Sequence, residues 1–221
     1  MTRPSIRKQL IYELVHFSSR IFLVLFFRLR CSGRRNVPDE GPVLICSNHQ
    51  SFFDPVVVGI SITRKMNYLA RKTLFDVIGL GWLISALDAI PIDRDGMGIG
   101  GLKETLRRLK KDQMVLIFPE GTRSSDGEVL SLKPGFCALA RRSKAPILPV
   151  AIDGAFQAWP KNSKFPRLSS VQVNVGEILP HDRIAAMSDE ELVDEVERRI
   201  RKCHRAARKL RCEPRVPDGR L

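Results

Sequence analysis

The sequence predicts an α/β fold: a single, largely parallel sheet flanked by helices, with a helical N-terminal segment and a basic C-terminal helix. Two observations lead to this fold class. Short apolar runs of strand type recur along the chain, and segments with helical periodicity separate them, an alternation typical of parallel sheets. The four clearest runs are Val43–Ser47, Ala89–Ile92, Met114–Phe118 and Ile147–Ile152. A weaker run, Val171–Val175, alternates with period two and is expected at a sheet edge.

Helices are expected between and after these strands. Asp54-Pro55 is typical of a helix start, because aspartate suits the capping position and proline suits the first turn. Apolar residues recur at helical spacing in Met97–Lys111, Gly135–Ser143 and Asp189–Leu210. The tail Glu213–Leu221 contains two prolines and a glycine, and we expect it to be frayed.

The N-terminal segment has an apolar helical face. Its run Ile21–Phe27 is wholly apolar, yet it is far shorter than the ~20 residues that cross a bilayer. Two sets of side chains fall on different helical faces: Glu13, His16 and Arg20 on one, and Leu10, Leu14, Phe17 and Ile21 on the other. This favours a helix in the membrane interface, over a helix packed on the protein's own core or a tilted transmembrane helix. We expect three parts: residues 1–30 membrane-associating, 31–212 the α/β domain, and 213–221 a flexible tail.

The chain is strongly basic. Its 221 residues carry a formal net charge of +13, which attracts polyanions such as nucleic acid, anionic lipid or phosphorylated substrates. The densest basic cluster is Arg198, Arg199, Arg201, Lys202, Arg205, Arg208, Lys209 and Arg211. It suits a solvated helix face, a membrane surface or an acidic carrier protein. Five cysteines without CxxC spacing argue against a disulfide framework and a zinc site, and favour a reducing compartment.

Polar residues follow three of the expected strands. His49 comes after the first, Arg94 after the second and Glu120 after the third. In open α/β sheets, ligands bind outside the carboxyl ends of the strands. The sequence therefore predicts a functional site at this edge.

His49 and Asp54 form the most specific pair at that edge. Pro55 disfavours helical geometry at Asp54, so the residues between are expected to form a turn that brings the carboxylate to the imidazole. A carboxylate can then fix the tautomer of the histidine and stabilise its cationic form. The alternative is that Asp54 only caps its helix and His49 is an ordinary surface residue.

The other two loops offer groups for an anion. The fork of Arg94 suits two phosphate oxygens, although an ion pair with a neighbouring aspartate is the alternative. In the third loop Gly121 allows close backbone approach, Thr122 offers a hydroxyl and Arg123 a charge, although a polar turn is the alternative. Lys103 is a further candidate for binding the anion, although a position on a solvated helix face is the alternative.

The chain contains no GxSxG elbow, P-loop or GxGxxG motif. A histidine–aspartate pair without a nucleophile indicates that His49 deprotonates a substrate hydroxyl directly.

Four ordered motifs carry a family resemblance. They are Asn48-His49-xxxx-Asp54, Ile90-Pro91-Ile92-Asp93-Arg94, Phe118-Pro119-Glu120-Gly121-Thr122-Arg123-Ser124 and Ala145-Pro146-Ile147-Leu148-Pro149-Val150. Over about residues 30–180 the chain resembles the glycerolipid acyltransferases, above all those that act on lysophosphatidate. It departs from them at Ala89, where the family often has glycine.

The resemblance implies specific roles. His49 would be the general base and Asp54 its orienting partner; Arg94, Glu120, Gly121 and Arg123 would bind or position a glycerol phosphate. Pro149 would shape the wall of the site.

The implied reaction moves a fatty acyl group from acyl-CoA or acyl carrier protein to the sn-2 hydroxyl of lysophosphatidate. It implies no cofactor beyond that co-substrate, no metal and no covalent acyl-enzyme. We expect a peripheral or monotopic enzyme at the cytoplasmic face of an anionic membrane. Two alternatives stay open: another acceptor, such as a lyso-ornithine lipid or another lysophospholipid, and a non-enzymatic nucleic-acid-binding protein.

Overall fold

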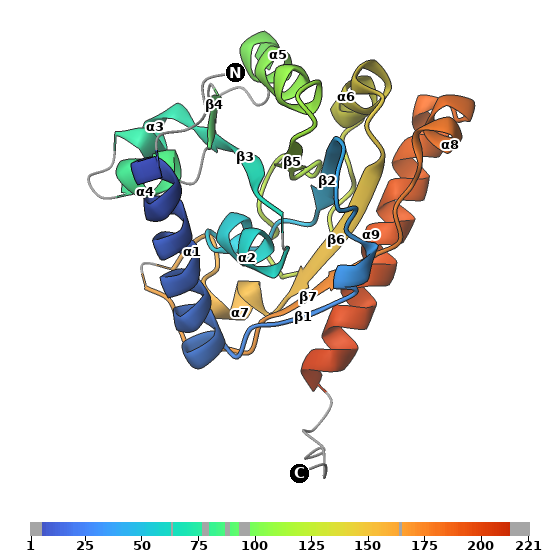
Figure 1. Cartoon of the computed structure of the whole chain (residues 1–221). Helices are drawn as coiled ribbons and strands as arrows, with labels where there is room; N and C mark the ends of the chain where they lie inside the picture. Colours follow the sequence, from blue (N-terminus) through green and yellow to red (C-terminus); the bar gives the residue numbers. More distant parts are fainter. Residues whose placement is uncertain are drawn as a thin grey trace.

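The computed structural model describes residues 6–62, 64–76, 80–86, 89–92, 98–163 and 165–212. Their strands form one seven-stranded sheet in the order β1-β7-β6-β2-β5-β3-β4, with helices on both faces (Figure 1). The strands are β1 Arg30–Ser32, β2 Val43–Ser47, β3 Met66–Arg71, β4 Ile90–Ile92, β5 Met114–Ile117, β6 Ile147–Asp153 and β7 Gln172–Val175. The predicted fold class is confirmed.

The helices alternate with the strands along most of the chain. They are α1 Ile6–Phe27, α2 Asp54–Ser61, α3 Lys72–Phe75, α4 Leu80–Ala86, α5 Gly98–Leu109, α6 Gly135–Ser143, α7 Ala155–Ala158, α8 His181–Ala186 and α9 Asp189–Cys212, with a short 3-10 turn η1 at Arg34–Asn36. All four helices expected inside the domain are present. The expected frayed tail, residues 213–221, lies outside the described part of the chain.

Two strands escaped the sequence patterns, and one was placed wrongly. The third strand, β3, contains polar Asn67, whose side chain is buried and donates to Met114 O at 3.3 Å. The first strand, β1, has only three residues. Because β1 pairs with β7, the run Val171–Val175 is not an edge strand as expected: β7 lies between β1 and β6, parallel to the former and antiparallel to the latter.

Alternating side chains of the central strand supply a core on each face of the sheet. On β2, Val43 and Ile45 face the cluster that includes α1 and α2, whereas Leu44 and Cys46 face the cluster formed with α6, α8 and α9. All four side chains are fully buried. A strand covered on both faces reads as a continuous apolar run, which explains why β2 was recognisable from the sequence.

Strand direction decides which residues meet at one edge. Strands β5 and β6 both run parallel to β2, so the three strands end at the same edge. Strand β7 runs the other way, and its first residue Gln172 lies opposite Asp153, the last residue of β6. Gln172 in turn lies opposite Arg30, the first residue of β1. One edge therefore carries the ends of β2, β5 and β6 together with the beginnings of β7 and β1.

Helix α1 lies against α2 and α4 and is only partly buried. Leu23 and Phe27 pack into the core, and the His16 ring lies 3.3 Å from Gly59 O of α2. Most of the exposed large hydrophobic side chains in the described part of the chain belong to α1: Leu14, Phe17, Ile21, Phe22, Val24, Leu25 and Phe26. Within that part, no helix is both long and apolar enough to cross a membrane.

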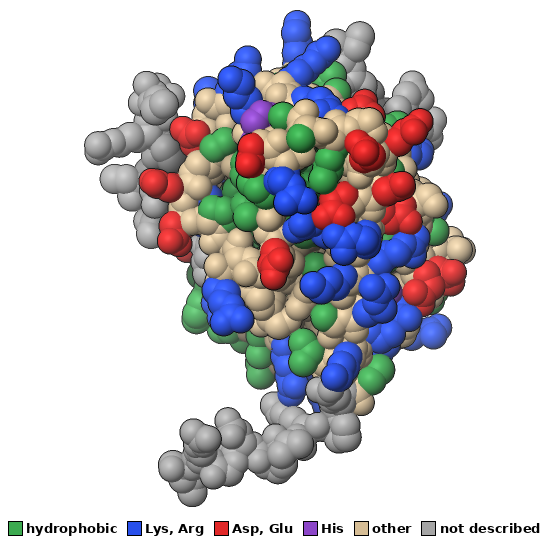
Figure 2. All heavy atoms as spheres, turned by 90° about the vertical axis from the view of Figure 1, so that its right-hand side faces the viewer, with side chains coloured by type: hydrophobic (Ala, Val, Ile, Leu, Met, Phe, Trp, Pro, Cys, Tyr) green, Lys and Arg blue, Asp and Glu red, His purple; other side chains and the backbone are tan. Residues whose placement is uncertain are grey.

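The outer face of α9 carries the basic cluster, and Figure 2 shows lysine and arginine side chains gathered there. Much of this charge is paired along the helix. Arg198 and Arg199 bind Glu195, and Arg201 binds Glu197, at three- and four-residue spacing. Ion pairs of this kind, within one helix and open to solvent, add little stability. These side chains therefore belong to a solvated helix face, one of the alternatives that the sequence allowed.

Candidate active site

The loop between β2 and α2, residues 48–53, is called the histidine loop. It folds Asp54 back onto His49. His49 Nδ1 lies 2.7 Å from Asp54 Oδ2, with the carboxylate fully buried and the imidazole about one fifth exposed. Asp54 is the first helical residue of α2 and makes no capping bond to the helix. The carboxylate therefore faces the imidazole, and the expected function of Asp54 as a helix cap is wrong.

Backbone amides hold the carboxylate in place. Asp54 Oδ2 also accepts hydrogen bonds from the Gln50 N–H at 2.6 Å and the Ser51 N–H at 2.7 Å. Two amide donors on the same oxygen fix the position of the carboxylate. If Nδ1 of His49 carries the proton that faces Asp54, Nε2 is the basic nitrogen directed away from the aspartate. Phe118 stacks on the imidazole with the ring centres 4.0 Å apart, which restricts its rotation.

The loop after β5 reaches the same place because β5 is the parallel neighbour of β2. Ser124 N–H donates to His49 O at 2.8 Å, and His49 N–H donates to Glu120 Oε1 at 3.3 Å. Glu120 is only 2% exposed. Burial raises the pKa of its carboxyl to about 8, the nearby Asp54 adds to this, and amide donors from His49 and Leu130 oppose it. Glu120 therefore joins the two loops from inside the protein.

Two cations belong to this loop, the partly buried Arg123 and the exposed Lys133. The Arg123 guanidinium lies 3.6 Å above the centre of the Phe52 ring, a cation–π contact with the histidine loop. Gly121 has φ +74, a left-handed conformation that favours glycine. A β-carbon there would lie 3.0 Å from Lys133 Nζ, so the missing side chain is what lets the lysine pack on the loop.

These two loops lie within residues 28–153, which match the family model described as Acyltransferase. The chain belongs to the acyltransferase family. This confirms the predicted resemblance and, at the level of the family, the enzyme class.

Curated relatives carry more specific names. The 1-acyl-sn-glycerol-3-phosphate acyltransferase of Bacillus subtilis is 30% identical over 65% of this chain and 71% of its own length. That of Pseudomonas aeruginosa is 33% identical over 70% of this chain and 60% of its own length. The chloroplastic LPAT1 of Arabidopsis thaliana is 28% identical over 67% of this chain. The chain spans 44% of the length of the plant protein, so it matches part of some relatives and most of others.

A solved structure shares the whole architecture. The crystal structure of the 1-acyl-sn-glycerophosphate acyltransferase PlsC from Thermotoga maritima superposes with a TM-score of 0.80 at 25% identity. The match covers 97% of this chain and 86% of that one. The structural match therefore extends beyond residues 28–153, the region that matches the family model, to nearly the whole chain.

The other predicted site residues of this acyltransferase lie in different surroundings. Arg94 lies outside the described residues. Thr122 is exposed in the loop beside Gly121. Lys103 is exposed on α5, which packs on β4, β5 and α6, so the structure does not bring it to the histidine loop. Pro149 lies inside β6, opposite Cys46 of β2, and its carbonyl accepts the Gly176 N–H at 2.8 Å.

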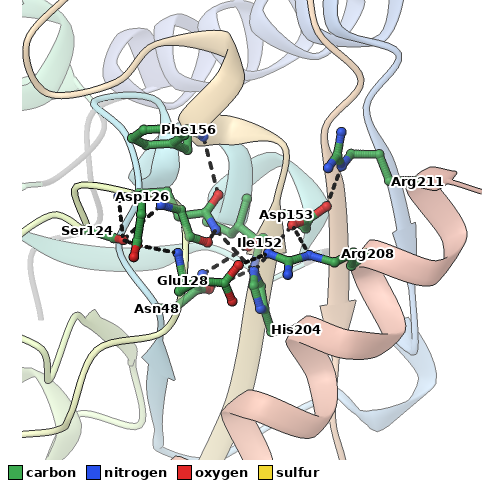
Figure 3. Close-up of polar contacts among 12 residues, drawn as sticks. Asn48, Ser124, Asp126, Glu128, Ile152, Asp153, Phe156, His204, Arg208 and Arg211 are labelled. Atoms are coloured by element: carbon green, nitrogen blue, oxygen red, sulfur yellow. Dashed lines mark hydrogen bonds and ion pairs between the residues drawn. The ribbon is translucent and has the colours of Figure 1, made fainter.

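Sequence reasoning missed the side chains that brace the histidine loop from behind. Asn48 extends the β2–β6 ladder: its amide donates to Ile152 O at 2.9 Å and accepts from Ile152 N at 2.8 Å (Figure 3). Gln50 donates to Gly127 O, accepts from Phe156 N at 3.3 Å, and lies 3.1 Å from His204 of α9. The sequence did contain a signal for these contacts: Asn48 and Gln50 flank His49 directly. An amide side chain that is buried in the core must find hydrogen-bond partners there.

His204 connects that loop to a buried charge at the end of β6. His204 Nε2 lies 3.3 Å from Asp153 Oδ1, and both side chains are almost fully buried. Arg208 and Arg211 of α9 point to the same carboxylate (Figure 3). Burial alone would raise the pKa of Asp153, but the bonds from His204, Arg211 and Arg208 lower it to about 2. Part of the basic cluster of α9 is therefore structural and holds the helix to the sheet edge where β6 ends.

Proposed function

We propose that the protein transfers a fatty acyl group from acyl-CoA or acyl carrier protein to the sn-2 hydroxyl of 1-acyl-sn-glycerol-3-phosphate, giving phosphatidate. The observation that carries this proposal is the 2.7 Å contact between His49 Nδ1 and Asp54 Oδ2. It orients a partly exposed base at the sheet edge of a protein whose relatives bear the name of this activity.

In the proposed reaction, His49 Nε2 removes the proton of the acceptor hydroxyl as its oxygen attacks the thioester carbonyl. The Asp54 carboxylate stabilises the imidazolium that forms, as an aspartate does in a catalytic triad. When the carbon–sulfur bond breaks, the imidazolium returns the proton to the departing thiolate. Atoms and charges balance without a metal or a covalent acyl-enzyme.

The cations of the loop after β5 suit the phosphate of the acceptor. Arg123 lies against Phe52 of the histidine loop, and Lys133 packs on Gly121. A phosphate held by Arg123 and Lys133 would leave the glycerol hydroxyl within reach of the base, and such positioning contributes several kcal/mol to catalysis. Arg94 is a third proposed ligand, on the family resemblance alone.

Exposed apolar side chains support a membrane-bound acceptor. Phe52 of the histidine loop is 43% exposed, and Phe165 and Leu168, in the segment before β7, are more than 70% exposed. Since β7 begins at the edge where β2 ends, these side chains and the apolar face of α1 suit one membrane surface. We propose peripheral or monotopic binding to the cytoplasmic face.

An acceptor screen tests the proposal. Purified full-length protein would receive labelled acyl-CoA or acyl carrier protein with lysophosphatidate, lysophosphatidylglycerol, lysophosphatidylcholine or a lyso-ornithine lipid. Labelled phosphatidate formed faster than the other products supports the proposal. Preference for an acceptor without a phosphate monoester would overturn the acceptor, and no labelled lipid with any acceptor would overturn the activity.

A further inference from the structure

A cavity of about 340 Å³ lies where the C-terminal ends of α1 and α9 meet the beginnings of β1 and β7. Its walls combine two kinds of side chain. Arg28, Arg30 and Arg211 supply charge, and Val24, Leu29 and Leu210 supply apolar surface. Gln172, which is 2% exposed, contributes a buried amide. A cavity with both characters suits an anionic amphiphile better than a simple ion.

Two of the three arginines that line this cavity have no acidic partner among the described residues. Arg211 is bound to Asp153, but Arg28 and Arg30 make no ion pair or hydrogen bond through their side chains with any residue that the structure describes. Both side chains are exposed. Two guanidinium groups that share a concave surface without a carboxylate favour a phosphate, which their planar forks bind through two oxygens.

The backbone at Arg28 is unusual for its residue type. Arg28 has φ +45, just after the last residue of α1, and Leu29 N–H bonds back to Leu23 O at 3.1 Å. Glycine is the usual residue where a helix ends in this left-handed conformation. Arginine in this conformation is less stable than glycine would be. In return, it places a guanidinium at the mouth of the cavity.

The position of the cavity indicates a lipid ligand. Arg30 begins β1 at the edge where β2 ends, three strands away, so the cavity lies roughly 15 Å along that edge from the histidine loop. Val24 lines the cavity and also belongs to the exposed apolar face of α1. A molecule in the cavity would touch both the cationic pair and the surface that we assign to the membrane.

We propose that this cavity binds the headgroup of one anionic phospholipid of the bilayer, with the phosphate on Arg28 and Arg30 and the first part of the acyl chains along Val24 and Leu210. This site is separate from the acceptor site at His49. Its test measures binding alone, so the result stands whether or not the proposed acyl transfer is confirmed.

The test uses full-length protein and dihexanoylphosphatidylglycerol below its micellar concentration, which separates a discrete site from attraction to a charged vesicle. We expect the Arg28→Gln/Arg30→Gln variant to bind this lipid roughly tenfold more weakly or worse. The matched control, Lys202→Gln/Arg205→Gln, removes the same charge from the exposed face of α9 and should bind as the unaltered protein does. Equal losses in the two variants, or no loss in the first, would overturn the proposal.

Two further experiments identify the ligand and distinguish a loss of binding from a loss of folding. Inorganic phosphate at the same concentration and ionic strength should not displace the lipid; if it does, the site takes a free anion and the lipid assignment is wrong. Arg28→Gly should raise the midpoint of thermal unfolding while weakening lipid binding, because it relieves the left-handed backbone and removes a ligand. A more stable variant with unchanged affinity would remove Arg28 from the site.

Discussion

The side-chain nitrogens of Gln50 and His204 lie 3.1 Å apart, which joins the histidine loop to the C-terminal helix. The Gln50 amide is fixed in orientation, since its oxygen accepts from Phe156 N and its nitrogen donates to Gly127 O. The backbone N–H of the same residue donates to Asp54. One residue therefore links the orienting carboxylate to a helix more than 150 positions away in the sequence.

Gln50→Ala should lower kcat about tenfold with little change in KM. It leaves a buried amide and a buried carbonyl without partners, at a cost of ~1–3 kcal/mol in the free energy of unfolding, and it loosens the loop that holds His49. Steady-state kinetics and urea unfolding measure the two effects. Ser125→Ala, at an exposed position in the neighbouring loop, is the control. A destabilised Gln50→Ala with a normal kcat would show that the brace is structural only.

His49→Ala should abolish acyl transfer and leave the circular dichroism spectrum unchanged, since a general base contributes roughly 10²–10⁴-fold. Asp54→Asn should reduce kcat by roughly 10³-fold or more, because an amide in place of the carboxylate disturbs the tautomer of His49 and no longer stabilises the imidazolium. His181→Ala, at the start of α8, serves as the control for loss of a histidine. Near-normal turnover in His49→Ala would exclude it as the base.

Glu120 should make stability depend on pH. Burial raises the pKa of its carboxyl from an ordinary value of 4.5 to about 8 in the folded protein. Between these values the unfolded chain releases the proton and the folded protein keeps it, so the free energy of unfolding falls as pH rises, by roughly 3–5 kcal/mol in all. Above about pH 8 both states are ionised and the loss is complete.

Glu120→Gln should flatten that profile. Glutamine keeps an oxygen for the His49 N–H but cannot ionise, and Glu120 Oε2 has no hydrogen-bond partner among the described residues. Urea unfolding at pH 5 and pH 9 gives the comparison. The variant should gain stability relative to the unaltered protein at the higher pH. If the two proteins show parallel profiles, Glu120 is ionised throughout.

Arg123→Gln should raise KM for lysophosphatidate and lower kcat/KM by roughly 10- to 100-fold, since it removes a proposed phosphate ligand. Arg123→Lys should restore little, because an ammonium cannot reproduce the planar contact with Phe52. Monoacylglycerol, which lacks the phosphate, provides an internal comparison: its slower acylation should be unaffected. Arg142→Gln, exposed on α6, is the matched control. Equal losses with both acceptors would mean that Arg123 has no role in phosphate binding.

Side chains of α1 should separate membrane binding from folding. Phe17→Ser/Leu25→Ser changes two exposed residues and should weaken liposome sedimentation while leaving the unfolding midpoint in place. Phe27→Ala empties a buried position against Phe53 and should cost ~3–5 kcal/mol of stability. Unchanged sedimentation of the first variant would exclude α1 as the membrane contact.

The sequence was most informative where burial or chemistry is local. Strands β2 and β6, covered on both faces, stand out as apolar runs, and α6 was predicted to the residue. The His49–Asp54 contact was also predicted, although Asp54 itself is helical, unlike what Pro55 suggested: α2 begins only at Asp54, so the residues before it are free to turn back.

The remainder depends on long-range pairing that no local pattern encodes. Strand β1 exists because β7 offers it a parallel partner about 140 residues later, and β7 was taken for an edge strand for the same reason. The Asp153–His204 contact joins a strand end to the middle of a long helix. Lys133 is held on the loop after β5 by its N–H bond to Pro119 O, and its side chain packs where Gly121 lacks a β-carbon. None of these positions has a distinctive neighbour in sequence.

The reversal of β7 and β1 brings the loops that carry His49 and Glu120, the C-terminal ends of α1 and α9, and the cationic cavity to one rim of the sheet. Among the residues that the structure describes, none of the proposed catalytic groups and none of the cavity-lining residues lies at the opposite rim. Selection on activity and selection on stability should therefore act on different rims of the same sheet. In a saturation mutagenesis library, harmful substitutions in loops at the opposite rim should lower the expression level and activity together. Harmful substitutions in the loops near His49 should include well-expressed, folded proteins that are inactive.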